Sequence, residues 1–495
     1  MADILVKPTG RINRRNPANE GDRLSEPLVR ENLLVRDGRI TQPKGTEKLN
    51  TTALSDRFRW LGRYYTIETG SLSPKTFASC KDGKFYLQDD QSGTHTLLPL
   101  ELAQDTYPKS ISIKVGNQTN LYLCDGVSLY KHDGNNDHKF EKISISFNPF
   151  DLEEHLDRLC AIDDTIFHIS KNFEFDNFTD STDAIDIIVG SGKGKNLALV
   201  KLESSLYVFT TEGIFRLVGD TISAVAETFE IRLINGKKGI VKGSIYKDNR
   251  GILFVACDHD NNYELYSFNG SDIEMLSYKE KLSDYVNPYR VNQMCATYYN
   301  GYYQCSFVEK GYVENNMEIW WDALENKCEF VRGRNVGIYF DTEIDTSKEL
   351  AYQQFGRSDA NFVMWAERGR NFDGAGIVKK LQIGDITPKK FEVVRFTDFY
   401  FDIEPTGDRS MLFRYLIDGR LSDLGGLAAD LIDLEGEHKA LGYIKITNQR
   451  QNWVRVQPKI KYSRGTSVSL EFIDSTINME FTLLSIGINF VEDKG

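Results

Sequence analysis

LYVFTTEGIFRLVGD, residues 206–220, and GILFVACDHDNNYELYSFNG, residues 251–270, carry the pattern that decides the fold. In each, two runs rich in Val, Ile, Phe and Tyr are separated by a short polar turn, which is typical of an antiparallel hairpin. Each hairpin has one strand that is almost entirely apolar and one that alternates. Inner strands of a radial array of sheets are buried on both faces, so this pattern predicts the blades of a β-propeller.

The same rhythm extends over residues 56–390 at irregular spacing. The clearest turn is Asn300-Gly301, a two-residue hairpin signal, and another hairpin closes at Glu325-Asn326. There is neither a WD dipeptide nor a sialidase box, and the spacing is too uneven for tight tandem repeats. We therefore expect an all-β chain with a central irregular β-propeller of about five to seven blades. Helix is expected only in short patterns, near residue 284 and over Leu427–His438.

The two ends of the chain depart from this rhythm. Residues 1–55 have little apolar periodicity, and we expect an extended N-terminal arm that becomes ordered against a neighbour or its own propeller. A first hairpin at Asp37-Gly38 completes this segment. Residues 391–495 alternate strictly and predict a C-terminal antiparallel β-sandwich. The basic residues of the first segment mark a candidate docking arm, with a floppy tail as the alternative: Arg11, Arg14, Arg15 and Arg23.

Composition narrows the classes of protein that fit. The formal net charge of −12 argues against a broad basic face that coats nucleic acid, although a conduit that must release DNA would also avoid strong attraction. No apolar run approaches the roughly 18 residues of a membrane span, and no signal-peptide core is visible. The seven cysteines are scattered through apolar strand patterns, so we expect buried, reduced thiols in a chain that folds in cytosol.

No motif predicts catalysis, a metal site or a cofactor. GSGKGKN, residues 190–196, looks like a phosphate loop, but its spacing is wrong and Asn196 replaces the required hydroxyl. DHDNN, residues 258–262, lacks the glycine and glutamate of a calcium loop, and the histidines show no zinc spacing. A glycosidase pair hidden among the many carboxylates would be invisible without coordinates. We therefore expect a protein that is not an enzyme.

Two basic turns are the candidate contacts for DNA. NGKKG, residues 235–239, presents Lys237 and Lys238, while GSGKGKN presents Lys193 and Lys195. Loops that project into a shared lumen would bring these ammonium groups against phosphate. The alternative is that both are solvated surface turns.

Several phrases of the sequence occur in a characteristic order. Arg158-Leu159 begins a strand that ends at Ser170, and an acidic-aromatic phrase follows at residues 175–178. LYVFTTEGIFRLVGD and LYSFNG (265–270) come next, residues 30–49 precede them, and RVQPKIKYSRGTSVSLEFID and LLSIGINFVE close the chain. This order resembles that of the tail-hub and nozzle proteins of tailed bacteriophages, a β-propeller family of head-closure and DNA-stabilisation proteins.

The resemblance implies a structural protein of the virion tail that is assembled in host cytoplasm. Such proteins commonly form a homo-oligomeric ring, implied here to be a hexamer, below the portal or adaptor. The ring lines the DNA channel, helps to retain the packaged genome and lets double-stranded DNA pass during ejection. For this chain we expect neither a cofactor nor a membrane span.

Two other classes of protein remain open from the sequence. One is a carbohydrate-binding or carbohydrate-cleaving propeller of a tail fibre, in which Trp and Tyr would stack on sugar rings. The other is a cytosolic propeller scaffold that binds a protein partner. Because folds host many functions, the choice among the three depends on the site.

Overall fold

The chain is all-β, as expected, with 56% of its residues in strands and 3% in helices. The computed structural model describes residues 2–7, 12, 27–36, 39–68, 71–90, 92–115, 118–134, 138–180, 183–219, 229–248, 250–258, 260, 262–340, 353–366, 368, 370–388, 392–403, 409–417, 429–432, 438–440, 443–446, 453–458, 464–474 and 482–492.

Most of the described chain forms small antiparallel units of four strands, which we call sheets 1 to 7 along the sequence. Six are separate four-stranded sheets, and sheet 6 is the first four strands of a nine-stranded sheet. Sheet 1 has strands β6 (Phe58–Glu68), β7 (Ser71–Cys80), β8 (Lys84–Gln88) and β9 (His95–Glu101). Sheet 2 has β10 (Lys109–Val115), β11 (Gln118–Cys124), β12 (Leu129–His132) and β13 (Glu141–Ile143). Sheet 3 has β14 (Asp151–His155), β15 (Arg158–Ile162), β16 (Ile166–Ile169) and β17 (Ile185–Ile188).

The second half of this series has the same arrangement. Sheet 4 has β18 (Asn196–Leu202), β19 (Ser205–Thr210), β20 (Ile214–Val218) and β21 (Glu230–Asn235). Sheet 5 has β22 (Tyr246–Lys247), β23 (Ile252–Cys257), β24 (Tyr263–Phe268) and β25 (Ile273–Met275). Sheet 6 has β26 (Cys295–Tyr299), β27 (Tyr302–Phe307), β28 (Met317–Asp322) and β29 (Lys327–Arg332). Sheet 7 has β30 (Val336–Tyr339), β31 (Gln354–Arg357), β32 (Val363–Ala366) and β5 (Thr46–Lys48).

The hairpins expected from the sequence are present in these sheets. β19 pairs antiparallel with β20, and β23 pairs with β24 along six residues. At the turn between β26 and β27, Asn300 has φ 51° and Gly301 has φ 85°, the two positive values that a type I′ turn requires. Asn and Gly adopt this conformation at low cost, which is why the dipeptide predicted the turn.

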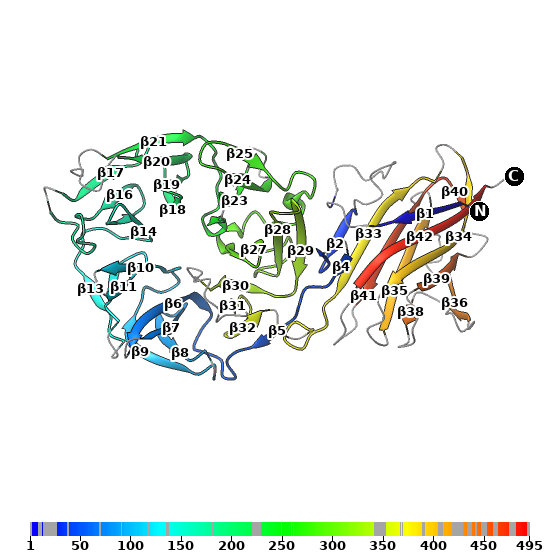
Figure 1. The fold of residues 1–495 in the computed structure, drawn as a ribbon, viewed down its shortest axis with the longest axis horizontal. Coiled ribbons are helices and arrows are strands. Elements are labelled where there is room, and N and C mark those ends of the chain that lie inside the picture. The colour runs from blue at the N-terminus through cyan, green and yellow to red at the C-terminus, as the bar shows by residue number, and fades with distance from the viewer. Residues whose placement is uncertain are drawn as a thin grey trace.

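Apolar clusters hold each small sheet against the next. Phe167 of sheet 3 and Val208 of sheet 4 share one cluster, and Phe209 of sheet 4 and Phe254 of sheet 5 share another. A further cluster joins the first sheet to the last, since it contains Leu61 together with Val363. Figure 1 shows the sheets following one another around a ring, with β6, β10, β14, β18 and β30 toward the middle.

The C-terminal strands form a second part beside the ring (Figure 1). One sheet has the order β3-β4-β42-β34-β39-β36-β37, with β1 also paired to β42 and β40 to β34. The other continues sheet 6 through β2, β33, β41, β35 and β38. Both contribute to one core, which includes Phe399 and Ile488 of the first sheet and Leu381 and Leu470 of the second. The strands are β1 (Ala2–Val6), β2 (Val29–Glu31), β3 (Leu34–Arg36), β4 (Arg39–Thr41), β33 (Lys379–Ile386), β34 (Val394–Ile403), β35 (Arg409–Ile417), β36 (Ala429–Ile432), β37 (His438–Ala440), β38 (Tyr443–Ile446), β39 (Trp453–Pro458), β40 (Arg464–Gly465), β41 (Val468–Asp474) and β42 (Thr482–Glu492).

The few described helices are short 3-10 turns. They are η3 (Lys242–Ser244), η4 (Leu282–Asp284) and η5 (Val291–Gln293). The helix expected near residue 284 is therefore a single 3-10 turn. The helix expected over Leu427–His438 is wrong where the structure describes this range, because β36 pairs with β39 and β37 pairs with β36. Pairing with a neighbouring strand overrides a local helical pattern.

The described residues of segment 1–55 are built into both parts of the molecule. β1 adds to β42, and β2 lies between β29 of the ring and β33 of the C-terminal part. Ile12 is buried in the cluster between sheets 5 and 6. β3 and β4 form the hairpin expected around Asp37-Gly38, and β5 completes sheet 7 beside β32 (Figure 1). The candidate docking residues lie outside the described residues: Arg11, Arg14, Arg15 and Arg23.

His132 makes stability depend on pH. Its ring is fully buried between Tyr64, Phe77 and Phe140, and burial lowers its pKa to about 4. Above the ordinary pKa near 6.5, the ring is neutral in both the folded and the unfolded chain, and the full stability of the fold is present. As pH falls from there through about 4, the unfolded chain binds a proton on this ring before the folded chain does, so the free energy of unfolding decreases. We expect His132→Phe to remove about 2–3 kcal/mol of this acid destabilisation. Denaturant titrations from pH 7 to pH 4 measure the free energy of unfolding, with Tyr130→Phe as control. If this free energy falls with pH equally in the wild type and in His132→Phe, the assignment is contradicted.

Candidate functional site at one end of the ring

Antiparallel order places many loops at the same end of the ring. In a sheet of four antiparallel strands, the first strand begins, the second ends, the third begins and the fourth ends on one side. The turns between second and third strands therefore share that side with the links to the next sheet. We call this side the connection end; it includes links 102–108, 144–150, 189–195, 236–245 and 276–294. All four candidate lysines lie in these links.

Glu212 lies between the two lysine-containing links. It is in the turn between β19 and β20, and its carboxylate accepts hydrogen bonds from the backbone N–H of Ser191, at 3.1 Å, and from the Ser191 hydroxyl. These bonds hold the pKa of Glu212 below its ordinary value, with smaller contributions from Lys238 and Lys193. One lysine from each link thus interacts electrostatically with the same carboxylate, without forming a close ion pair with it among the described residues.

The other two candidate lysines have different surroundings. The Lys195 ammonium lies 3.3 Å from an oxygen of Asp164. Lys237 instead packs on sheet 5, with its Nζ 4.1 Å from the centre of the Tyr266 ring and 3.4 Å from the carbonyl oxygen of Cys257. Burial lowers the pKa of Lys237. Within the described residues, Lys237 is therefore the least available of the four for contact with a phosphate.

Side chains from four sheets meet near the middle of the connection end. Lys242, at the start of sheet 5, places its Nζ 3.8 Å from the centre of the Phe150 ring, which precedes sheet 3. Asp151 accepts the backbone N–H of Leu199 at 3.0 Å and so bridges sheets 3 and 4. Burial raises the pKa of Asp151, while Lys109 of sheet 2 opposes this effect. The link before sheet 5 thus touches the link before sheet 3, although sheet 4 lies between these two sheets. The space between the links is therefore narrow at this point.

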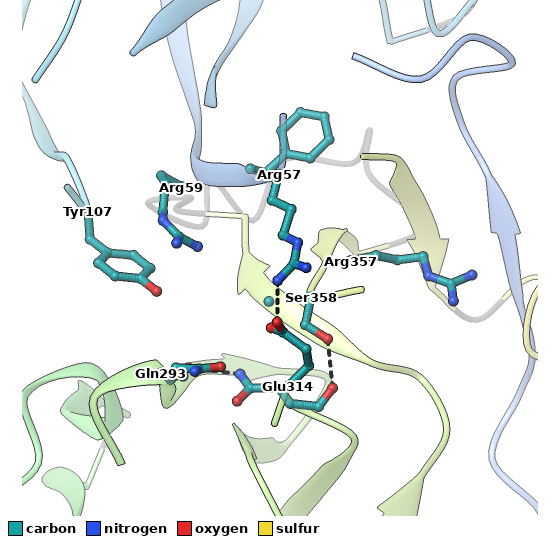
Figure 2. Close-up of a pocket in the computed structure, with 10 residues that line it drawn as sticks. Arg57, Arg59, Tyr107, Gln293, Glu314, Arg357 and Ser358 are labelled. Carbon is teal, nitrogen blue, oxygen red and sulfur yellow. Dashed lines mark hydrogen bonds and ion pairs between the residues drawn. The ribbon is translucent and has the colours of Figure 1, made fainter. Parts of the chain in front are cut away.

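A pocket opens across the same end, and Figure 2 shows its lining. Arg57 and Arg59 enter it from the start of sheet 1, Tyr107 from the link between sheets 1 and 2, and Glu314 from sheet 6. The Arg57 guanidinium lies 2.5 Å from Glu314, as Figure 2 shows. Arg59 lies 2.7 Å from an oxygen of Asp105 and stacks on Tyr107 at 4.8 Å.

The third arginine of the pocket is also paired with carboxylates. Arg357 donates to Asp359 at 2.7 Å and to Asp373 at 2.8 Å. The remaining lining residues are polar or small, and Ser358 donates a hydrogen bond to the carbonyl oxygen of Asn315. Because every guanidinium faces at least one carboxylate, the pocket carries little net charge and would attract phosphate only weakly.

The described ranges of the chain contain no group of three or more His, Cys, Asp and Glu side chains that could hold a metal ion. In the same ranges, no helix has both the length and the apolar character needed to cross a membrane. None of the seven cysteines, all of which are described, forms a disulfide, and only Cys257 is incompletely buried, as expected from their strand contexts. Burial raises the pKa of the thiols of Cys80, Cys124, Cys160, Cys295 and Cys305, for example that of Cys305 to about 12.

Sequence reasoning missed the residues that neutralise the basic groups. Glu212, Asp164, Asp105 and Glu314 are separated from their partners by tens to hundreds of positions, and no spacing rule connects them. The only available signal was that an acidic residue lies in many of the turns between second and third strands. The chain matches no protein-family model and no curated protein.

Proposed function

We propose that this chain is a structural protein of a bacteriophage tail, several copies of which form a ring around the path of the DNA. Its ring of small sheets would be a seven-bladed β-propeller. Two observations support the propeller: β5 supplies the fourth strand of sheet 7, and one apolar cluster spans sheets 7 and 1. Its C-terminal part would be the β-sandwich of the same family.

The narrow, charge-compensated connection end carries this proposal. A B-DNA duplex is wider than its own major groove of about 12 Å, so it does not fit where Lys242 touches Phe150 across sheet 4. The path of the DNA would therefore lie between copies rather than through one. Ion pairs at Arg57, Arg59 and Lys195 limit attraction to phosphate, as a conduit that must release DNA requires.

The remaining features follow from the same proposal. Lys193 and Lys238, which form no ion pair with a carboxylate within the described ranges, would be the transient contacts to DNA. Portal or adaptor proteins and other tail proteins would be the neighbours, and a hexamer is the assembly implied by the resemblance. The protein would act in the virion, after assembly in host cytoplasm, without catalysis.

The mass of the purified full-length chain in solution tests the proposal. One chain weighs 56.5 kDa. We expect light scattering to show the mass of a ring, which is a fixed whole-number multiple of the mass of one chain. This ring should form either from the chain alone at micromolar concentration or after addition of proteins encoded beside it. A chain that stays monomeric under both conditions would contradict the proposed ring.

A further inference from the structure

Phe173 has a backbone conformation that an aromatic residue rarely adopts. It lies in the connection between β16 and β17 with φ 58°, and its N–H donates to the carbonyl oxygen of Asp157 at 2.9 Å. Left-handed backbone is unfavourable for a residue with a bulky side chain. The side chain is also 61% exposed, so the fold does not recover this cost by burying the ring. Strained residues with no structural benefit are often functional.

The turn around Phe173 is fixed and acidic. Lys171 and Glu174 form a β-bridge and an ion pair of 2.6 Å, and Lys171 also lies 3.4 Å from Asp180. Asp176 pairs with Lys131 of sheet 2 at 2.9 Å. Three carboxylates thus surround two ammonium groups next to an exposed aromatic ring. We call Phe173, Glu174 and Asp176 the knob.

A second exposed apolar group lies at the connection end. Tyr289 is 90% exposed, Tyr312 50% and Val313 62%. Their loops are braced together: Asn287 donates from its side chain to the carbonyl oxygen of Tyr312 at 3.2 Å, and Gln293 donates to that of Val313 at 3.3 Å. Rigid loops that hold exposed aromatic side chains lose little entropy on binding. We call Tyr289, Tyr312 and Val313 the socket.

The charges beside the socket have the sign opposite to those of the knob. Arg290 is exposed and has no carboxylate partner among the described residues. Lys310 is exposed as well, and its ammonium donates to the carbonyl oxygen of Ser283 at 2.8 Å. Glu309, on the same loop, is already neutralised by Arg332 at 2.6 Å. The socket therefore favours an apolar partner with carboxylates beside it.

Knob and socket lie on opposite ends of the ring of sheets within one chain. The knob is in a connection between third and fourth strands, whereas the socket is formed by the link 276–294 and by a turn between second and third strands. The two groups therefore cannot meet within one chain. A closed ring of identical chains needs such a pair of different, complementary surfaces, because its contacts are heterologous.

We infer that the knob of one copy docks into the socket of the next copy. The Phe173 ring packs against Tyr289, Tyr312 and Val313, while Arg290 and Lys310 face the knob carboxylates. This inference rests on the proposed ring and names the residues that would form its contacts.

Two single variants and their mixture test the contact. Phe173→Asp removes the knob and keeps the socket, whereas Tyr289→Asp removes the socket and keeps the knob. We expect each variant alone to be monomeric, with association weakened more than about tenfold. When the two are mixed, the intact knob of the Tyr289→Asp chain meets the intact socket of the Phe173→Asp chain. Light scattering should then show a one-to-one dimer that grows no further.

A third variant separates docking from folding. Phe173→Gly relieves the left-handed strain, so we expect its melting temperature to rise while assembly is lost. Leu324→Asp, in an 80% exposed turn of sheet 6, is the matched control and should assemble as the wild type does. If the wild type assembles and the knob and socket variants assemble equally well, the inference is overturned, while the proposed ring of copies is retained. A wild type that remains monomeric overturns both. Binding to a glycan array that the wild type shows and the Tyr289→Asp variant loses would assign the socket to saccharide and overturn the inference.

Discussion

Replacing Arg30 with methionine lowers the free energy of unfolding by about 3–5 kcal/mol, because it leaves a buried carboxylate without its partner. Arg30 donates from Nε and Nη2 to the two oxygens of Glu329, at 2.7 and 2.6 Å, and both side chains are almost completely excluded from solvent. The pair joins β2 to β29, where the ring continues into the C-terminal part. Urea titration at pH 7 measures the loss.

The stability of the Arg30→Met variant should depend on pH in a way that identifies Glu329 as the cause. Burial already raises the pKa of Glu329, and Arg30 opposes that rise. Without Arg30 the pKa rises further, so the variant is most stable below the ordinary glutamate pKa near 4.3 and loses stability as pH increases through the raised value. The double variant Arg30→Met, Glu329→Met should recover most of the loss. Arg232→Met removes an exposed pair with Glu230 and should leave stability unchanged; an equal loss in both single variants would refute the argument.

Deleting residues 1–30 should destabilise the C-terminal part together with sheets 5 and 6, by at least about 6 kcal/mol in total, and leave the hairpins of the other sheets folded. The deletion removes Arg30, the buried side chains of Val6 and Ile12, and the strand that pairs with β42 from Ala2 to Val6. A loss of this size approaches the whole stability of a typical domain. Under the proposal of a tail ring, the truncated chain is also expected to fail to join tail particles.

Calorimetry and hydrogen exchange can separate the two parts of the molecule. We expect an early transition, with fast exchange at β42, followed by a later transition of the other sheets of the ring. A shorter deletion of residues 1–7, which keeps Ile12 and Arg30, should give an intermediate shift. If the longer deletion melts as the full-length chain does, the first thirty residues are an independent arm rather than part of the fold.

Local chemistry was enough to predict the hairpins of the ring. Asn300-Gly301 requires two positive φ angles, and alternating apolar residues then set which strands pair. The placement of the N-terminal strands was not predictable in this way. β5 pairs with β32, and Arg30 finds Glu329 across 299 positions, so the deciding contacts are made with sequence that no local window contains.

The candidate site was predictable only in part, for the same reason. Turn composition indicated where lysines would be exposed, but it did not indicate that Lys237 would stack on Tyr266 or that Lys193 and Lys238 would share Glu212. The knob and socket also had no sequence signal. Phe173 looks like any other apolar residue until its backbone conformation and exposure are known.

The pairing of β5 with β32 has a consequence for synthesis on the ribosome. Lys48 is translated early, but its partner Met364 is translated roughly 300 residues later, which takes on the order of tens of seconds at about 5–20 residues per second. During that interval, sheet 7 cannot form. The strand β5 of the nascent chain has not yet met its partner β32 and is open to pairing with other nascent chains nearby. In a cell making many copies at once, chaperones that shield residues 46–48 until translation ends would therefore raise the yield of correctly folded protein.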